Sequence, residues 1–472
     1  MKHLEPIDLQ VKTNRADFEN VNESVESCQS QIRKLNSKTN AVIWQDDKHI
    51  EEQIEQLRTQ RELNPDLDFD LLGCPILVKE LDSSISGTPN AWGNLQLKNE
   101  GFCDSFTSTS VTKLMNAGAI VMGKTNNPEL GLTVTTQSKA HGDCNNPLDL
   151  TRNSGGSSGG SAASVASSMT SVALGSDGGG SIRIPASVCG IFGFKPSRGV
   201  IPLGPMIEEA WAGLVCKGLV ASNLNDLTSV LNVFSDFDNS YQLENSSKLN
   251  LETLKIGIRT DAFSNLYEVN PEVKSAIELF ATYLSDLGCQ ISYSNPTAYD
   301  DESIIETFLD VISYNTYQDV EFLKSRTKSY MDMDSLENET KYFYDKGSLI
   351  SKETYLELKK QLISFSNTID AWHQNFDFLI TPTTCDVAPI HGEVEKDPEL
   401  SPFIYGGLCF PSNIAGAPAL SIPVRNHSKN GLPVGIQIIG KRGSDNLVLN
   451  FGEFCNSDYS DIFVTQIRDI TN

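Results

Sequence analysis

Apolar positions in the N-terminal part of the chain recur at helical spacing, and short runs that are apolar throughout lie between these segments. Residues 20–62 are polar, with apolar positions spaced for one helical face, so we expect two helices there. They lead to an expected strand at 74–78. A helix that begins at Asp104 or Ser105 and a buried strand over 117–123 are expected next.

The C-terminal half shows the same alternation on a larger scale. The run from Pro271 to Gly288 has apolar side chains on one face, proline at its start and glycine at its end, which is typical of a helix. Residues 300–372 are acidic and mostly helical in pattern. Short apolar runs bounded by proline and glycine then predict three buried strands, at 376–382, 418–424 and 432–440. Strands that alternate with helices at both ends predict the α/β class.

The composition is that of a soluble globular protein, with 39% hydrophobic and 21% charged residues. No apolar run is long enough for a membrane helix, and the N-terminus lacks the apolar core of a secretory signal. We therefore expect a cytoplasmic protein with no membrane partner. The formal charge of −24 repels nucleic acid, so no nucleic-acid partner is expected. Isolated cysteines and dispersed histidines predict neither a disulfide framework nor a bound metal.

The most unusual feature is a stretch rich in glycine and serine, residues 154–181. Its composition alone allows a flexible linker, a phosphate-binding loop, or a helix packed closely on a strand. Apolar sequence surrounds it, as SVALGS and IRIPASVCGIFGF, which argues against a solvated linker. The glycines lack the neighbours of a phosphate loop, GKS or GKT. The remaining interpretation is a site where glycine N–H groups point at a developing oxyanion beside serine hydroxyls.

Two strings in this stretch, GGSSGGS at 155–161 and GSDGGGSIR at 175–183, resemble the motifs of the amidase signature family. The family's nucleophile matches Ser181, and its second serine matches Ser157 at the family's spacing. GCPILVKE resembles the strand that carries the family's lysine, which makes that residue Lys79. Further strings extend the resemblance in family order over most of the chain: GAIVMGKTNNPELG, FGFKPSRG, DFLITPT and GLPVGIQIIG.

This resemblance implies the amidase-signature fold, a large mixed β-sheet flanked by helices on both faces. It implies one domain over residues 1–472, with 20–62 as an N-terminal helical segment and 300–372 as a variable helical insertion that shapes the pocket. The implied substrate is a small-molecule amide, whose carbon–nitrogen bond is hydrolysed without a cofactor. The sequence leaves open whether the protein forms a homodimer.

The implied catalytic set has Ser181 as nucleophile, Ser157 as proton relay after a cis Gly156–Ser157 peptide bond, and Lys79 as base. Lysine acts as a base only when neutral, so its reference pKa of about 10.4 must fall. The apolar run before Lys79 favours such a fall, because desolvation disfavours the ammonium form. By itself, a lysine that ends an apolar strand is more often a surface residue. The two serine motifs favour the interpretation of Lys79 as a base.

Neighbouring residues receive roles from the same resemblance. The expected oxyanion donors are the backbone N–H groups of Gly178, Gly179, Gly180 and Ser181. Ser158 is expected to bond within its loop, and Asp177 and Arg183 are expected to hold the turn around the nucleophile rather than to touch substrate. His141 is a candidate for a substrate contact in the pocket.

Two other functions stay open at this point. One is the A subunit of a glutamyl-tRNA(Gln) amidotransferase, which usually carries a GYYDAYY-like string before DFLITPT, where this chain has YFYDKGSLISKETYLELKKQL. The other is a catalytically inactive binding protein, against which the intact Lys79, Ser157 and Ser181 argue. VTTQSKAHG and IRIPASVCG resemble the branch of the family that includes the 6-aminohexanoate cyclic-dimer hydrolases. None of these strings indicates which amide is the substrate.

Overall fold

A computed structural model of the chain describes residues 5–235, 241–243, 249–396, 401–424 and 430–458. Its strands in chain order are β1 (Val42–Trp44), β2 (Pro75–Lys79), β3 (Ile120–Thr125), β4 (Asn145–Asn146), β5 (Asp149–Asn153), β6 (Val172–Asp177), β7 (Phe192–Lys195), β8 (Cys216–Ala221), β9 (Lys255–Ile258), β10 (Gln290–Ser292), β11 (Phe378–Pro382), β12 (Ala419–Val424) and β13 (Val434–Gly440).

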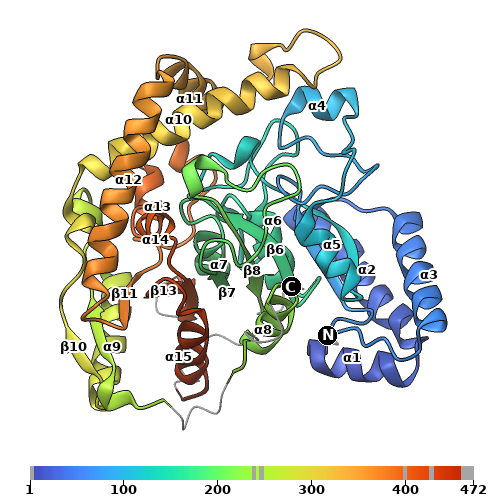
Figure 1. Cartoon of the computed structure of the whole chain (residues 1–472), viewed down its shortest axis with the longest axis horizontal. Helices are drawn as coiled ribbons and strands as arrows, with labels where there is room; N and C mark the ends of the chain where they lie inside the picture. Colours follow the sequence, from blue (N-terminus) through green and yellow to red (C-terminus); the bar gives the residue numbers. More distant parts are fainter. Residues whose placement is uncertain (1–4, 236–240, 244–248, 397–400, 425–429, 459–472) are drawn as a thin grey trace.

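All of these strands except β4 and β5 form one 11-stranded sheet within the described residues (Figure 1). The strand order is β1-β3-β2-β6-β8-β7-β12-β13-β11-β9-β10. Pairing is parallel from β3 through β2 to β6 and from β11 through β9 to β10, and antiparallel at the other joins. The sheet is therefore mixed, as predicted.

Helices cover both faces of the sheet. They are α1 (Ile7–Ala16), α2 (Asn20–Thr39), α3 (Asp47–Leu63), α4 (Leu95–Glu100), α5 (Thr109–Asn116), α6 (Gly159–Ala166), α7 (Arg183–Cys189), α8 (Leu224–Asn232), α9 (Pro271–Asp286), α10 (Ser303–Lys324), α11 (Asn338–Ser348), α12 (Lys352–Trp372), α13 (Ser401–Gly406), α14 (Phe410–Ala415) and α15 (Asp445–Asp458). Figure 1 shows α10 and α11 crossing the end of the molecule opposite α1 and α15.

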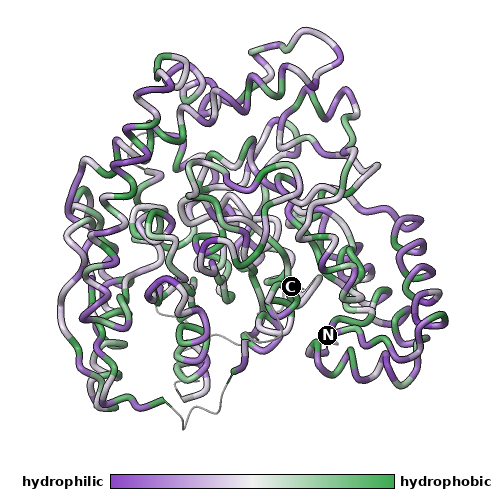
Figure 2. The backbone as a smooth tube through the Cα atoms, in the orientation of Figure 1, coloured by the Kyte–Doolittle hydropathy of each residue, from purple (hydrophilic) through white to green (hydrophobic). Residues whose placement is uncertain are grey.

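The core lies along the sheet. Figure 2 shows hydrophobic and hydrophilic positions alternating along the outer helices. Strand β2 illustrates the core of the sheet, because Ile76, Leu77 and Val78 are each completely buried. Such uninterrupted apolar runs are typical of strands that are covered on both faces.

Most of the elements expected from the sequence are confirmed. The two helices of residues 20–62 are α2 and α3, although the short strand β1 lies between them. The 271–288 helix is α9, the region 300–372 forms α10, α11 and α12, and the three C-terminal strands are β11, β12 and β13. The glycine-serine stretch contains α6 and β6, both completely or almost completely buried, so it is not a linker.

The helix expected from residue 104 was wrong at its start, since α5 begins at Thr109. Asp104 is used differently: its carboxylate lies 3.2 Å from Lys124 Nζ and accepts a hydrogen bond from Asn90 at 3.0 Å. The Asp104 and Lys124 side chains are 1% and 0% exposed. Asp104, which the pattern predicted as a helix cap, therefore forms a buried ion pair instead.

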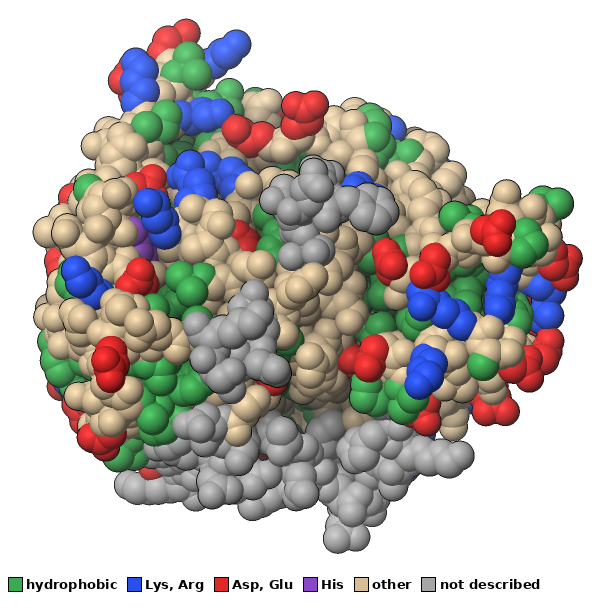
Figure 3. All heavy atoms as spheres, turned by 60° about the horizontal axis from the view of Figure 1, so that its bottom comes forward, with side chains coloured by type: hydrophobic (Ala, Val, Ile, Leu, Met, Phe, Trp, Pro, Cys, Tyr) green, Lys and Arg blue, Asp and Glu red, His purple; other side chains and the backbone are tan. Residues whose placement is uncertain are grey.

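Surface features agree with the composition. Figure 3 shows acidic and basic side chains interspersed over one face of the molecule. The ten cysteines are free thiols, and all but Cys103 are buried. None of the helices in the described part of the chain is long and apolar enough to cross a membrane.

Candidate active site

Lys79 is the last residue of β2, and its side chain is completely buried. Its Nζ donates hydrogen bonds to Ser157 Oγ at 2.8 Å and to Ser176 Oγ at 3.0 Å. Burial lowers the pKa of Lys79 from 10.5 to about 8, although the negative charges of Asp82 and Asp177 act in the opposite direction. About a tenth of this amine is therefore neutral at pH 7, beside a serine hydroxyl.

Ser157 and Ser181 lie on two adjoining segments. Ser157 follows a cis peptide bond with Gly156 and precedes helix α6. The N–H of Ser158 donates to the carbonyl oxygen of Ser181 at 3.1 Å, which holds the two segments side by side. The Ser158 hydroxyl donates to the carbonyl of Ser176 at 3.1 Å, so it bonds to the strand that precedes the nucleophile loop. Ser157 is almost completely buried, whereas Ser181 is partly exposed.

Asp177 and Arg183 form a buried ion pair across the turn that contains Ser181. Arg183 Nη2 and Nε donate to the two Asp177 carboxylate oxygens at 2.8 Å and 2.9 Å. The same oxygens accept from the N–H groups of Gly180 and Ile182 at 2.7 Å and 3.1 Å. Burial alone would raise the pKa of Asp177, but the charge and hydrogen bonds of Arg183 hold it well below its usual range.

The remaining guanidinium hydrogens of Arg183 reach the start of α14 and strand β13. They are donated to the carbonyl of Cys409 and to the side chains of Ser412, Asn413 and Gln437. Asn413 in turn donates to the Asp177 carboxylate at 2.9 Å and to the Asp177 carbonyl at 2.8 Å. These contacts make the pair a structural clamp on the turn.

The backbone N–H groups expected to bind the oxyanion differ in whether they already have a hydrogen-bond partner. The Gly180 N–H is bonded to Asp177, so this group is not free to meet a substrate oxygen, which contradicts its expected role. No partner for the N–H groups of Gly178, Gly179 and Ser181 is seen within the described part of the chain. These three groups stay the candidates for stabilising an oxyanion.

His141, the candidate for a substrate contact, lies close to the end of the lysine strand. Its ring is 7% exposed, and Nε2 lies 3.3 Å from a carboxylate oxygen of Glu80, the residue after Lys79. Glu80 also accepts from the N–H groups of Ala91 and Gly93 at 2.8 Å and 3.1 Å. His141 therefore faces the buried carboxylate that follows the lysine strand, and its contact with substrate stays a prediction.

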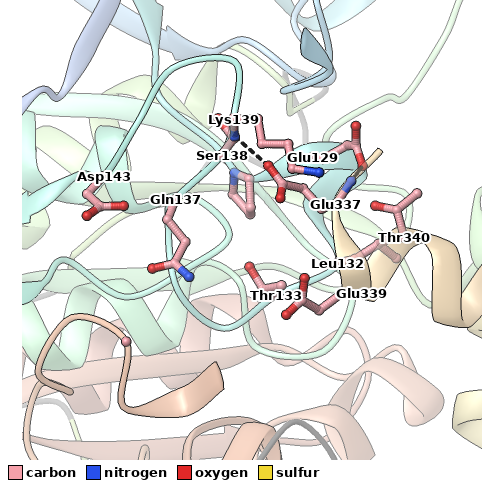
Figure 4. A pocket seen from close by; sticks show the side chains of 12 residues that line it. Glu129, Leu132, Thr133, Gln137, Ser138, Lys139, Asp143, Glu337, Glu339 and Thr340 are labelled. Carbon is pink, nitrogen blue, oxygen red and sulfur yellow. Dashed lines mark hydrogen bonds between the residues drawn. The ribbon is translucent and has the colours of Figure 1, made fainter. Parts of the chain in front are cut away.

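A cavity of about 360 Å³ lies between the segment after β3 and the start of α11 (Figure 4). One wall contains Leu132, which follows Gly131, and a Cβ atom placed on Gly131 would lie 3.1 Å from Ser157 Oγ. The cavity therefore lies next to Ser157, the candidate proton relay. Its charged lining is mostly acidic: Glu129, Lys139, Asp143, Glu337 and Glu339. The N–H of Lys139 donates to Glu337, as Figure 4 shows.

Several residues of the site were missed from the sequence. Ser176, the second acceptor for Lys79, could have been found from strand alternation, because it precedes Asp177 and must point to the other face. Gln437 lies in the string GLPVGIQIIG, but neither it nor Asn413 carried a local sign of contact with Arg183, because they reach it from segments more than two hundred residues away. Trp211 and Phe308, which pack on the glycines before Ser181, also carried none.

Known proteins resemble this chain over most of its length. The 6-aminohexanoate-cyclic-dimer hydrolase of Paenarthrobacter ureafaciens is 29% identical over 450 residues, which cover 90% of this chain and 89% of that protein. A glutamyl-tRNA(Gln) amidotransferase subunit of Prochlorococcus marinus subsp. pastoris is 30% identical over 460 residues, covering 90% and 92%.

Solved structures give the same result for the fold. A 6-aminohexanoate cyclic dimer hydrolase complexed with substrate superposes with a TM-score of 0.87 and 27% identity, and the match covers 100% of both chains. A bacterial aryl acylamidase of the amidase signature family superposes with a TM-score of 0.84 and 25% identity, covering 97% and 98%. The family model described as Amidase matches residues 23–449. This chain belongs to the amidase family, in the group of amidase signature enzymes.

Proposed function

We propose that this amide-hydrolysing enzyme cleaves a carbon–nitrogen amide bond through an acyl-enzyme on Ser181. The observation that carries the proposal is the 2.8 Å hydrogen bond from the buried Lys79 amine to Ser157 Oγ, beside the segment that bears Ser181. Lys79 takes part in none of the ion pairs in the described part of the chain, so no carboxylate neutralises it by direct contact. A buried amine with a lowered pKa is suited to act as a base.

In the first half of the reaction, neutral Lys79 accepts the proton of Ser157 while Ser157 accepts the proton of Ser181. The Ser181 oxygen forms a bond to the carbonyl carbon, and the carbonyl oxygen becomes an oxyanion. The N–H groups of Gly178, Gly179 and Ser181 are the candidates that donate to it, and each such donor contributes about 3 kcal/mol in other enzymes.

In the second half, the proton held by Lys79 returns through Ser157 to the amide nitrogen as the carbon–nitrogen bond breaks. The amine leaves, and the acyl group stays on Ser181 as an ester. A water molecule then loses a proton to the same relay and attacks this ester. The carboxylate product leaves, and the proton returns to Ser181.

A fluorophosphonate probe tests the nucleophile directly, because it reacts with an activated serine. We expect the probe to label Ser181, which peptide mass spectrometry would locate. Ser181→Ala should abolish both labelling and amide turnover, whereas Ser222→Ala, at an exposed serine, should leave both unchanged. Labelling at another residue, with turnover retained in Ser181→Ala, would refute the assignment.

Assays of the purified protein distinguish the amidase from the two alternatives, an amidotransferase subunit and a catalytically inactive binding protein. A free-standing amidase releases ammonia or amine from small amides when no other protein and no tRNA is present. Release that appears only when tRNA and a partner protein are added would favour the amidotransferase function. Labelling and turnover both absent in a folded protein would favour a binding protein. The cytoplasmic location stays a prediction, and the homodimer stays open.

A further inference from the structure

The ring of Trp211 covers part of the turn that carries Ser181. A Cβ atom placed on Gly178, three positions before Ser181, would lie 2.9 Å from Cε3 and from Cζ3 of this ring. The indole therefore packs directly on the backbone of the turn, and glycine at this position allows the close approach. Trp211 and Ser181 are each partly exposed. Because the ring lies on this turn, both residues reach solvent in the same region.

The backbone that carries the ring has an unusual conformation. Trp211 and Ala212 have φ angles of 49° and 54°, and Gly213 follows with a φ angle of 84°. Residues other than glycine rarely adopt left-handed φ angles, so this conformation persists only where surrounding contacts enforce it. Two such residues in succession beside the nucleophile turn indicate that the position of the Trp211 ring is closely fixed.

Two polar side chains supply contacts that fix this segment. The Arg198 guanidinium lies against Gly213, where an added Cβ atom would be 3.3 Å from Cζ. The Asn413 amide donates to the carbonyl oxygen of Leu214 at 3.1 Å and to that of Asp177 at 2.8 Å. This amide therefore joins the segment to the nucleophile turn, and the ring is held in one place relative to the nucleophile.

Further apolar groups lie around the exposed part of the turn. A Cβ atom placed on Gly179 would lie 2.9 Å from Cζ of Phe308, which is on α10. A Cβ atom placed on Gly406, at the end of α13, would lie 3.4 Å from the Gly179 carbonyl oxygen and 3.6 Å from Cγ1 of Val134. Gly179 itself is partly exposed. A ligand at this point would therefore meet aromatic and aliphatic side chains.

The charged residues nearest to Ser181 in the sequence, Asp177 and Arg183, are not available to a ligand. Both side chains are 0% exposed, and they pair with each other at 2.8 Å. A charged acyl group beside the Trp211 ring would therefore lose hydration without gaining a partner from this pair. An apolar acyl group would instead be stabilised in proportion to the apolar area that it buries.

We propose that Trp211 is a specificity-determining residue, whose ring packs against an apolar acyl group of the substrate while the scissile carbonyl lies at Ser181. The inference rests on the proposed function of Ser181 and names the class of amide that the site prefers. That class is an amide whose acyl group is an apolar chain of several carbons, long enough to cover the indole, rather than a short or polar one.

A series of fluorophosphonates measures this preference without knowledge of the natural substrate, because the group on phosphorus takes the place of the acyl chain. The probes carry methyl, n-butyl or 2-methoxyethyl, and the last two match in length but differ in polarity. Rates of Ser181 labelling are followed by mass spectrometry and divided by the hydrolysis rate of each probe in buffer. We expect butyl to react roughly 10- to 50-fold faster than methyl, since each fully buried methylene contributes roughly fourfold. The methoxyethyl probe should react more slowly than the butyl probe.

Variants of Trp211 test whether the ring causes this preference. Trp211→Ala should lower the butyl-to-methyl ratio roughly 10-fold and leave the methyl rate little changed. Trp211→Leu keeps some apolar contact and should lower the ratio roughly threefold, and it serves as the second variant if circular dichroism shows that the alanine protein does not fold. Trp372→Leu is the matched control, because it replaces another partly exposed indole, one that stacks on Phe376 at 4.2 Å. It should leave the ratio unchanged.

Three results would overturn the inference. The first is a wild-type protein that reacts no faster with butyl than with methyl or methoxyethyl. The second is an equal loss of rate with butyl and methyl in the Trp211 variants, because the ring would then only support the turn. The third is an unchanged ratio in folded Trp211 variants. Failure of every probe to label Ser181 in the wild type would instead overturn the proposed function.

Discussion

The strands β2 and β6 and the helices α10–α12 meet at the candidate site, but they are held together in opposite ways. Around β2 and β6, the charged groups Lys79, Asp177 and Arg183 are completely buried, and each hydrogen-bonds to named partners inside the protein. The three helices pack by apolar contacts and by partly exposed polar pairs such as Asp310 and Lys346, and α12 exposes Leu356 and Ile363 to solvent.

This difference separates the reaction from the choice of substrate. A polar network that is fully satisfied fixes one geometry, because any missing member leaves a buried group without a partner. Helix α10 touches the turn before Ser181 through Phe308, and Trp211, from the segment before β8, packs on the same turn. Their sequence is therefore free to change the shape and charge above Ser181 without altering the proton relay.

The largest expected effect lies in the buried network, at Lys79. Lys79→Ala should lower kcat/KM roughly 10²- to 10⁴-fold, because both proton transfers lose their carrier. Lys79→Arg should be no better, since a guanidinium does not deprotonate in this range. In the wild type, the neutral amine is the active form and the pKa is about 8. The rate should therefore rise with pH and level off above about 8.

Steady-state kinetics across pH, with circular dichroism as the folding control, measures this prediction. Lys217 offers a matched control, because it is also a completely buried lysine with a pKa lowered to about 8, but it bonds to Ser110 and a backbone carbonyl instead of Ser157. Lys217→Arg should not move the pH profile. Near wild-type turnover in a folded Lys79→Arg protein would exclude lysine as the base.

The next effect is on stability, at Arg183. Arg183→Met leaves the Asp177 carboxylate buried without its cation, which costs about 3–5 kcal/mol of unfolding free energy. Arg33→Met removes an exposed pair with Glu26 and should cost less than about 1 kcal/mol. Urea denaturation gives both values. Equal costs at the two sites would show that the clamp around Ser181 does not stabilise the fold.

The same contrast explains what the sequence could predict. The resemblance of short motifs predicted Lys79, Ser157 and Ser181 as the catalytic candidates, and the apolar runs predicted β2, β6 and the C-terminal strands, because these signals are local. The environment of His141 could not be predicted, since it depends on Glu80, more than sixty residues earlier in the chain. The hydrogen bond from the Gly180 N–H to Asp177 could not be predicted either, because it depends on the backbone conformation of the turn.

A smaller effect is expected where the two regions touch, at Gly179 and Phe308. In Gly179→Ala the new methyl group would meet the Phe308 ring at 2.9 Å, so either the turn or α10 must shift. We expect kcat to fall roughly 10- to 100-fold. Phe308→Leu in the same protein should restore part of the rate, because it removes the far end of the ring. A double-mutant cycle on kcat measures this coupling. Strict additivity would mean that α10 does not constrain the nucleophile turn.

The smallest effect is expected on the outer face of α12. Leu356 and Ile363 are 49% and 60% exposed, so Leu356→Gln and Ile363→Gln should change the unfolding free energy by less than about 0.5 kcal/mol. On the inner face of the same helix, Leu358 and Leu362 are 7% and 6% exposed, and their replacement by alanine should cost about 2–5 kcal/mol each. These four variants share one helix, so its intrinsic stability cancels and only the packing differs.

Denaturation at two protein concentrations adds a second test. If the outer-face variants lose stability, and the loss grows with protein concentration, then a second copy of the chain covers this face in solution. Such a result would mean that the helices are held by a homodimer as well as by contacts within one chain.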